Sequence, residues 1–149
     1  MHTDPQEPLG RIIYQTAQLI KNFAEKMLKP YELTLEQFHL LKHMQQDAGM
    51  SQRELGELVD KTPANITRIL DRLEAKNLVL RRPSKTDRRT THVFLTRDGD
   101  MLKSKVLATF EPLSAQLTEG ISDKRQDETR KILATITKNI QIMSQRFQS

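Results

Sequence analysis

Cysteine is absent from this sequence of 149 residues, which excludes disulfides, thiolate metal sites and cysteine-based redox sensing. No apolar run approaches the ~20 residues that a membrane-spanning helix needs, and the polar N-terminus lacks the apolar stretch of a signal peptide. Glycine-rich phosphate loops and nucleophile elbows are also missing. We therefore expect a soluble, cytoplasmic chain that is neither a membrane protein nor an enzyme.

Positive charge is concentrated in one part of the chain. The whole sequence carries a net charge of +5. Between Lys61 and His92 there are nine basic and three acidic residues, a net charge of +6, while the remainder holds 15 basic and 16 acidic residues. A local basic patch of this kind is typical of nucleic-acid binding. The alternative interpretation is an ordinary solvated basic face.

Apolar residues recur at helical spacing in six stretches, which predicts about one domain of mostly α-helical structure. Hydroxyl residues at the N-cap mark where five of these helices begin, and proline, glycine or asparagine marks where several end. The expected helices span roughly residues 8–29, 34–47, 51–59, 62–77, 96–120 and 122–147.

Residues 78–96 are typical of a β-hairpin. Apolar alternation runs into a polar, basic tip and then returns, as expected for two antiparallel strands joined by a turn. The tip is long and positively charged, and it directly follows a helix that also carries arginines. A basic hairpin beside a basic helix can hold a polyanionic double helix at two places, so DNA is the first partner to test.

The two short helices joined by Asp60, Lys61, Thr62 and Pro63 match a helix-turn-helix, whose second helix lies in the major groove. When the apolar stripe of that second helix is buried, its opposite face presents side chains suited to base edges. Asparagine can pair with adenine, arginine with guanine, and small apolar groups with the thymine methyl. The residues on that face are Thr62, Ala64, Asn65, Thr67, Arg68 and Arg72.

Several motifs of the chain resemble those of the MarR family of bacterial transcription regulators. They are Leu33-Thr34-Leu35-Glu36-Gln37-Phe38, Ser51-Gln52-Arg53-Glu54-Leu55, the run from Asn65 to Glu74, Arg81-Arg82, Asp87-Arg88-Arg89 and Leu95-Thr96-Arg97-Asp98-Gly99. The resemblance runs in register from about residue 9 to 117, and the last helix fits only by its pattern. The sequence departs from the family at Asn77, where glycine is usual.

The resemblance implies a winged helix-turn-helix (mostly α with a small β-hairpin wing, α+β) carried on a homodimer. Residues 1–32 and 98–149 would form dimerisation helices, and residues 33–97 the DNA-binding domain, all within one compact unit. The two recognition helices would read a roughly palindromic operator, with Arg89 of the wing in the minor groove. The habit of the family favours a repressor, although no residue decides between a repressor and an activator.

The complete set of residues predicted to contribute to DNA binding is Ser51, Thr62, Ala64, Asn65, Thr67, Arg68, Arg72, Arg81, Arg82, Lys85, Asp87, Arg88 and Arg89. Arg81, Arg82 and Lys85 are expected on the phosphate side. Asp71 and Asp87 would repel phosphate, so we expect them to orient neighbouring arginines, in particular Arg88 or Arg89.

Three alternatives remain at this point. His39 and His43 have a metal-compatible spacing, but no further ligand accompanies them, and we expect no metal and no cofactor. The resemblance suggests a small aromatic effector, for which Tyr14, Phe38 and Phe110 could line a cavity or could simply be core. The last alternative is a sensing or protein-interaction dimer whose winged domain no longer binds DNA.

Overall fold

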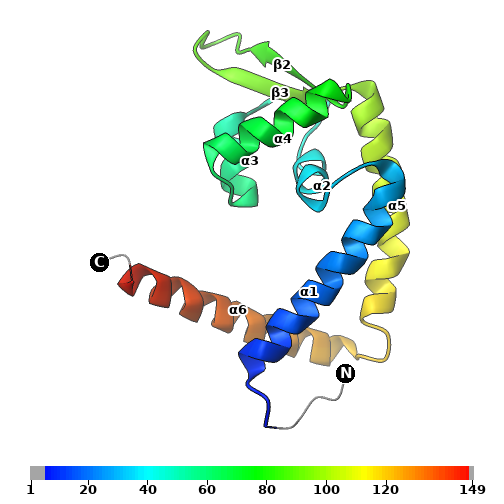
Figure 1. The fold of residues 1–149 in the computed structure, drawn as a ribbon, viewed down its shortest axis with the longest axis vertical. Helices are drawn as coiled ribbons and strands as arrows, with labels where there is room; N and C mark the ends of the chain where they lie inside the picture. Colours follow the sequence, from blue (N-terminus) through cyan, green and yellow to red (C-terminus); the bar gives the residue numbers. More distant parts are fainter. Residues whose placement is uncertain (1–5, 148–149) are drawn as a thin grey trace. The chain divides into compact units, whose positions relative to one another are not determined.

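The computed structural model describes residues 6–147 of the chain. It is mostly helical, with one small antiparallel sheet, as the sequence predicts (Figure 1). In chain order the elements are α1 (Leu9–Leu28), the 3-10 helix η1 (Lys29–Tyr31), α2 (Leu35–Leu41), β1 (Met50–Ser51), α3 (Gln52–Val59), α4 (Pro63–Ala75), β2 (Val79–Pro83), β3 (Thr91–Leu95), α5 (Arg97–Leu117) and α6 (Asp123–Arg146).

The chain divides into two compact units, Met1–Ala108 and Thr109–Ser149. The division falls inside α5, one turn before Pro112. Proline has no N–H to donate to the carbonyl four residues earlier, here that of Ala108, so the helical hydrogen bonding is interrupted at the boundary.

The core of the first unit lies between α1, α2, α3, α4 and the sheet. Each helix contributes the apolar stripe that its sequence period predicts, and the strands contribute the inward-facing residues of their alternation. The largest side chains with almost no exposed surface are Leu28, Leu40, Leu41, Met44, Leu55, Ile66, Leu70, Leu73, Val79, Val93 and Val106.

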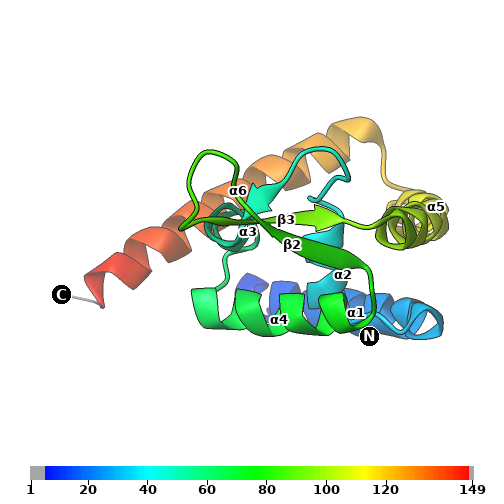
Figure 2. The ribbon, with the colours of Figure 1, turned by 90° about the horizontal axis from the view of Figure 1, so that it is seen from above.

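The sheet has the strand order β1-β3-β2, and the hairpin β2–β3 lies beside α4 and α3 (Figure 2). Val79 pairs with Leu95 and Arg82 with His92 in the antiparallel register of the hairpin. The short strand β1 was not predicted from the sequence, because two residues are too few to show alternation. It pairs Ser51 with His92, which connects the start of α3 to the wing.

The second predicted helix was too long. It was expected to fade near residues 47–49, but α2 ends at Leu41. The N–H groups of His43 and Met44 bond to the carbonyls of Leu40 and Leu41, three residues back, which tightens and ends the last turn. The carbonyl of Gln45 then accepts from the N–H of Leu95, so this backbone joins the sheet rather than the helix.

The connections on either side of the wing follow the predicted capping. Asn77 has a φ of 57°, the left-handed conformation expected at the end of α4. The Thr96 hydroxyl accepts from the N–H of Gly99 at 3.0 Å and donates to the carbonyl of Asn77 at 2.7 Å. A Cβ at Gly99 would collide with the carbonyl of Leu78, so the glycine allows α5 to start against the wing. Ser122 occupies the N-cap of α6, but its side chain makes no capping hydrogen bond.

Candidate nucleic-acid interface

The turn between α3 and α4 is held by local backbone chemistry. Asp60 ends α3 in the left-handed conformation, with φ 52° and ψ 53°, and its N–H donates to the carbonyl of Gly56. The Thr62 hydroxyl then accepts from the N–H of Asn65 at 3.4 Å, and Pro63 occupies the first helical position. The sequence predicted this cap and proline, and together they set the angle at which α4 leaves the turn.

One face of α4 is buried and the other is open, as the apolar pattern predicts. Ile66, Leu70 and Leu73 have no exposed surface, and Ile69 retains only 4%. The predicted reading face lies opposite. Thr62, Ala64, Thr67, Arg68 and Arg72 are exposed, and Asn65 is half-buried.

Two of the predicted base-reading side chains contact each other. The Arg68 guanidinium donates from Nη2 to Asn65 Oδ1 at 3.5 Å, a long and weak hydrogen bond. The bond is easily exchanged for one to a base, so both side chains remain available to a ligand at the N-terminal half of α4.

The tip of the wing is a turn organised by Ser84 and Asp87. The buried Ser84 hydroxyl accepts from the N–H groups of Thr86 at 3.3 Å and Asp87 at 3.4 Å. One carboxylate oxygen of Asp87 accepts from the N–H of Arg89 at 2.9 Å, and the other accepts from the Thr90 hydroxyl at 3.2 Å. Asp87 therefore orients the main chain at Arg89, one of the two arginines that the sequence suggested for this role.

The cations of the wing tip point to solvent. Lys85, Arg88 and Arg89 are exposed, as is Arg82 at the base of the tip. The Arg82 guanidinium carbon lies 5.9 Å from the centroid of the Phe94 ring, which is a cation–π distance. The tip thus combines a fixed backbone turn with long basic side chains, an arrangement suited to phosphate or to a narrow groove.

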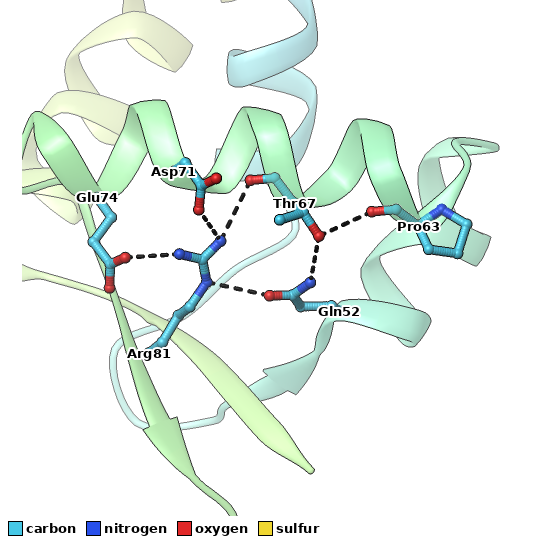
Figure 3. Close-up of polar contacts among 6 residues, drawn as sticks. All are labelled: Gln52, Pro63, Thr67, Asp71, Glu74 and Arg81. Carbon is cyan, nitrogen blue, oxygen red and sulfur yellow. Dashed lines mark hydrogen bonds and ion pairs between the residues drawn. The ribbon is translucent and has the colours of Figure 1, made fainter. Parts of the chain in front are cut away.

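Arg81 lies in an acidic environment that the sequence did not predict. Its guanidinium, which was expected on the phosphate side, is bound by Asp71 and Glu74 of α4, each at 2.7 Å. Asp71 was expected to orient Arg88 or Arg89, and its partner in the structure is Arg81 instead. No short-range pattern joins residues 71, 74 and 81, because their meeting depends on how β2 crosses α4 (Figure 3).

Ser51 lies where β1 becomes α3 and forms a reciprocal capping box with Glu54. The Ser51 hydroxyl accepts from the N–H of Glu54 at 3.2 Å, and the Glu54 carboxylate accepts from the N–H of Ser51 at 2.7 Å. The hydrogen bonds from the N–H and then the hydroxyl of Ser51 lower the pKa of Glu54, because both favour the charged carboxylate.

A groove of about 340 Å³ lies between this end of α3 and the wing. Its lining residues carry hydroxyl, amide or guanidinium groups. They are Ser51, Gln52, Arg53, Arg89, Thr90 and Thr91. The chemistry of this lining matches that of the side chains that position a phosphate backbone.

The turn of the helix-turn-helix is also anchored from α2, by a contact that the sequence did not predict. Lys61 Nζ lies 2.8 Å from Glu36 Oε1. The hydrogen bond to Lys61 lowers the pKa of the Glu36 carboxyl, with partial burial acting in the opposite direction. The Lys61 side chain is therefore paired with a carboxylate of the protein itself, although Lys61 is one of the nine basic residues counted between Lys61 and His92.

The histidines considered for a metal and the aromatic residues considered for an effector differ in their local environments. Among residues 6–147, no group of three or more histidine, cysteine, aspartate or glutamate side chains could hold a metal ion. His43 lies beyond the end of α2, so the helical spacing of His39 and His43 does not persist. Phe38 is buried in the core, Tyr14 is 65% exposed, and Phe110 belongs to the second unit.

No helix within residues 6–147 combines the length and the apolarity that a bilayer crossing requires.

Comparison with known proteins gives one family match. The model of the MarR family matches residues 33–91, which contain α2, α3, α4, β2 and the wing tip. The matched range contains all of the predicted DNA-binding residues, from Ser51 to Arg89.

Solved structures share the fold over nearly their whole length. The apo form of wild-type MarR from E. coli is 27% identical with a TM-score of 0.70, over 87% of this chain and 97% of that chain. A mutant of E. coli MarR complexed with operator DNA is 27% identical with a TM-score of 0.79, over 87% and 93%. The S. aureus MepR–DNA complex is 20% identical with a TM-score of 0.83, over 90% and 99%.

Proposed function

The chain belongs to the MarR family, and we propose that it is a transcriptional regulator that binds double-stranded DNA in a sequence-specific manner. The observation that carries this proposal is the pairing of two exposed basic features on one winged unit. The reading face of α4 presents Arg68 and Arg72, and the wing tip presents Lys85, Arg88 and Arg89. A protein of 27% identity and the same fold is known in complex with operator DNA, which supports the same ligand here.

The two features would divide the work of recognition. Side chains at the N-terminal half of α4 reach base edges in the major groove, where asparagine and arginine can form bidentate pairs. Arg89 at the tip of the wing enters the minor groove, where narrow A·T-rich segments attract arginine. Arg82 and Lys85 contact phosphates, which position the protein without reading sequence.

We further propose a homodimer, with residues 33–97 as the DNA-binding domain and residues 1–32 and 98–149 as the dimerisation helices. The apolar side chains of α6 support this. None of its residues is buried in the single chain, and Ile132, Leu133, Ile140 and Met143 are 42–56% exposed. Apolar surface of this extent needs a partner. On α1, Leu19, Ile20 and Phe23 are 44–59% exposed and offer a further apolar face for dimerisation.

A two-fold symmetric dimer would read a palindromic operator, with half-site centres about one helical turn, or ~10 bp, apart. We propose repression as the outcome, because a dimer seated on an operator blocks the access of polymerase. The first experiment is to select bound fragments from the source genome and to align them. A shared palindrome with that spacing supports the proposal, and fragments without a common sequence contradict it.

Titration of the selected duplex over a range of salt concentrations tests the DNA interface itself. Each phosphate that the protein neutralises steepens the slope of log K against log salt by about 0.9. We expect a steep slope for the unaltered protein and a shallower one for the double variant Arg88→Ala, Arg89→Ala. Lys124→Ala at the start of α6 is the matched control, since it removes an exposed charge outside the patch. A flat slope for the unaltered protein contradicts DNA binding.

Release of DNA by a small aromatic effector is the remaining part of the proposal. Tyr14 and Phe110 are the aromatic residues considered for it that are not fully buried in the described chain. Phenolic compounds added to the preformed complex test it, with loss of binding at unchanged salt as the supporting result. Binding that is insensitive to a broad set of such compounds removes the effector from the proposal.

A further inference from the structure

The guanidinium of Arg81 is the meeting point of three elements at the base of the wing (Figure 3). Arg81 lies on β2, and it reaches α4, where Nη2 contacts Asp71 Oδ1 and Nη1 contacts Glu74 Oε2, each at 2.7 Å. Only 19% of the Arg81 side chain is exposed, against 59% for Asp71 and 43% for Glu74. The arginine is thus the most enclosed member of the cluster.

The same guanidinium also connects to α3. Arg81 Nε donates to Gln52 Oε1 at 3.2 Å, and the Gln52 amide donates to the Thr67 hydroxyl at 3.1 Å. That hydroxyl donates to the carbonyl of Pro63 at 3.1 Å, and Arg81 Nη2 donates to the carbonyl of Thr67 at 3.4 Å. The network therefore joins the wing, the recognition helix and the first helix of the helix-turn-helix.

The arrangement leaves Arg81 little capacity for phosphate. A guanidinium has five N–H donors in a fixed fork, and four hydrogen bonds already engage that of Arg81. Bidentate phosphate binding needs two free, parallel donors. The charges oppose it as well, because Arg81, Asp71 and Glu74 together carry a net charge of −1.

We propose that Arg81 is a positioning residue that sets the wing against the recognition helix, so that Arg89 and the face of α4 engage the same DNA site. This inference rests on the proposed function. A planar fork held by two carboxylates resists rotation, which a single contact would permit. Gln52 extends the constraint to α3, so the position of the wing is fixed relative to both helices of the helix-turn-helix and not to α4 alone.

The neighbouring Arg82 provides a matched control, because it is on the same strand, is exposed and lies outside this network. The assay is salt-dependent binding of the selected duplex by the full-length protein. Arg81→Ala should weaken binding by on the order of tenfold, the size of one lost specific contact, with an unchanged salt slope. Arg82→Ala should instead make the slope shallower by about 0.9.

A double variant distinguishes a positioning role from a phosphate-binding role of Arg81, because the two roles predict opposite changes in DNA affinity. Asp71→Asn with Glu74→Gln removes two negative charges while it preserves side-chain shape. If Arg81 were a phosphate ligand held back by these acids, the double variant would bind more tightly with a steeper slope. Positioning predicts weaker binding at the same slope. Tighter binding with a steeper slope overturns the proposal.

Coupling between the base and the tip of the wing separates positioning from a general loss of structure. In the unaltered protein Arg89→Ala should lower the affinity, whereas in the Arg81→Ala background it should lower the affinity much less, because the wing is no longer held over the groove. Equal losses in both backgrounds overturn the proposal. Thermal unfolding of each variant verifies that the winged unit stays folded. If Arg81→Ala unfolds, the DNA affinity and salt slope of the double variant Asp71→Asn, Glu74→Gln test the proposal instead.

The two levels of proposal fail in different ways. An unaltered protein with no salt-dependent DNA binding overturns the proposed function and the role of Arg81 together. An unaltered protein that binds with a steep slope, combined with an Arg81→Ala variant of shallower slope, overturns the positioning role alone.

Discussion

Arg81 and Arg82 are neighbours on one strand, yet the structure gives them opposite environments. Successive side chains of a strand point to opposite faces, so Arg81 turns toward α4 and Arg82 turns away. Arg81 meets two carboxylates at 2.7 Å, whereas Arg82 is exposed and lies 5.9 Å from the Phe94 ring. Residue type alone therefore does not fix the environment of an arginine, because that environment depends on which charges the fold places opposite the guanidinium.

The same comparison changes how the basic patch is counted. Asp71 and Glu74 are two of its three acidic residues, and both are bound to Arg81. Without these three residues, the segment from Lys61 to His92 holds eight basic residues and Asp87, a net charge of +7. The negative charges of Asp71 and Glu74 are therefore not spread evenly over the exposed positive surface. They are gathered at the base of the wing, away from its basic tip.

The largest effect is expected from a substitution in the hydrophobic core, because the environments of Arg81 and Arg82 both depend on it. Leu70 has no exposed surface and lies on the buried face of α4, so Leu70→Ala should lower the free energy of unfolding by about 2–5 kcal/mol. The affinity for DNA should fall together with the stability, because the tip and the base of the wing both depend on this core. Urea unfolding at a fixed protein concentration measures the loss. Leu58→Ala is the control, because Leu58 is 53% exposed; a similar cost for both would contradict the assigned core.

A smaller effect is expected from Arg68, the exposed arginine that we propose as a reader of bases. Arg68→Ala should cost ~1–3 kcal/mol of binding free energy and relax the sequence preference at one base pair. The cost should disappear for operators changed at that pair, while the salt slope stays nearly constant. Competition between operator variants measures the preference. Unaltered selectivity would remove Arg68 from the residues that read sequence.

Asp87 sharpens the contrast between charge and geometry at the tip. Asp87→Ala removes a negative charge near DNA, yet we expect weaker binding, since the carboxylate holds the N–H of Arg89 and the Thr90 hydroxyl. The loss should be about 1 kcal/mol, the usual contribution of such hydrogen bonds. Binding assays against Glu119→Ala, an acid outside the patch, provide the control. Tighter binding by Asp87→Ala would show that charge outweighs the turn.

The smallest effect concerns acid pH. The pKa of Glu36 is lowered in the folded protein by its hydrogen bond to Lys61, so its contribution to stability is complete above the unfolded pKa. The contribution is lost as the pH falls through the folded pKa. Because the pair is partly exposed, we expect only a few tenths of a kcal/mol. Glu36→Gln should flatten the decline of stability on the acid side, and an identical pH profile would contradict this contact.

Much of this fold could be predicted because its signals are local. Helical period, N-cap hydroxyls and the proline after Thr62 are properties of short segments. The period reappears in α1, the N-cap hydroxyls in α3 and α4, and the proline at the start of α4. The left-handed Asn77 follows from the same local chemistry. The exposed reading face of α4 was predictable as well, since a buried stripe defines its opposite side.

The errors occurred where distant segments compete for the same backbone or side chain. The end of α2 and the strand β1 depend on pairing with β3, which lies more than forty residues later. The Gln45 carbonyl accepts from the N–H of Leu95, and Met50–Ser51 pairs with Val93 and His92. The environment of Arg81 depends on a helix and a strand that meet only in the folded unit. No window of sequence contains these contacts, so periodicity could not reveal them.

By itself, the sequence determined the helical segments, the hairpin, the concentration of positive charge between Lys61 and His92 and the resemblance to the MarR family over residues 33–91. Those properties follow from composition and from interactions a few residues apart. Only the tertiary structure decided which arginines face solvent and which are bound within the protein. The physical reason is that an ion pair requires two groups to lie within a few ångströms of each other, and for Arg81 that proximity is created by the packing of β2 on α4.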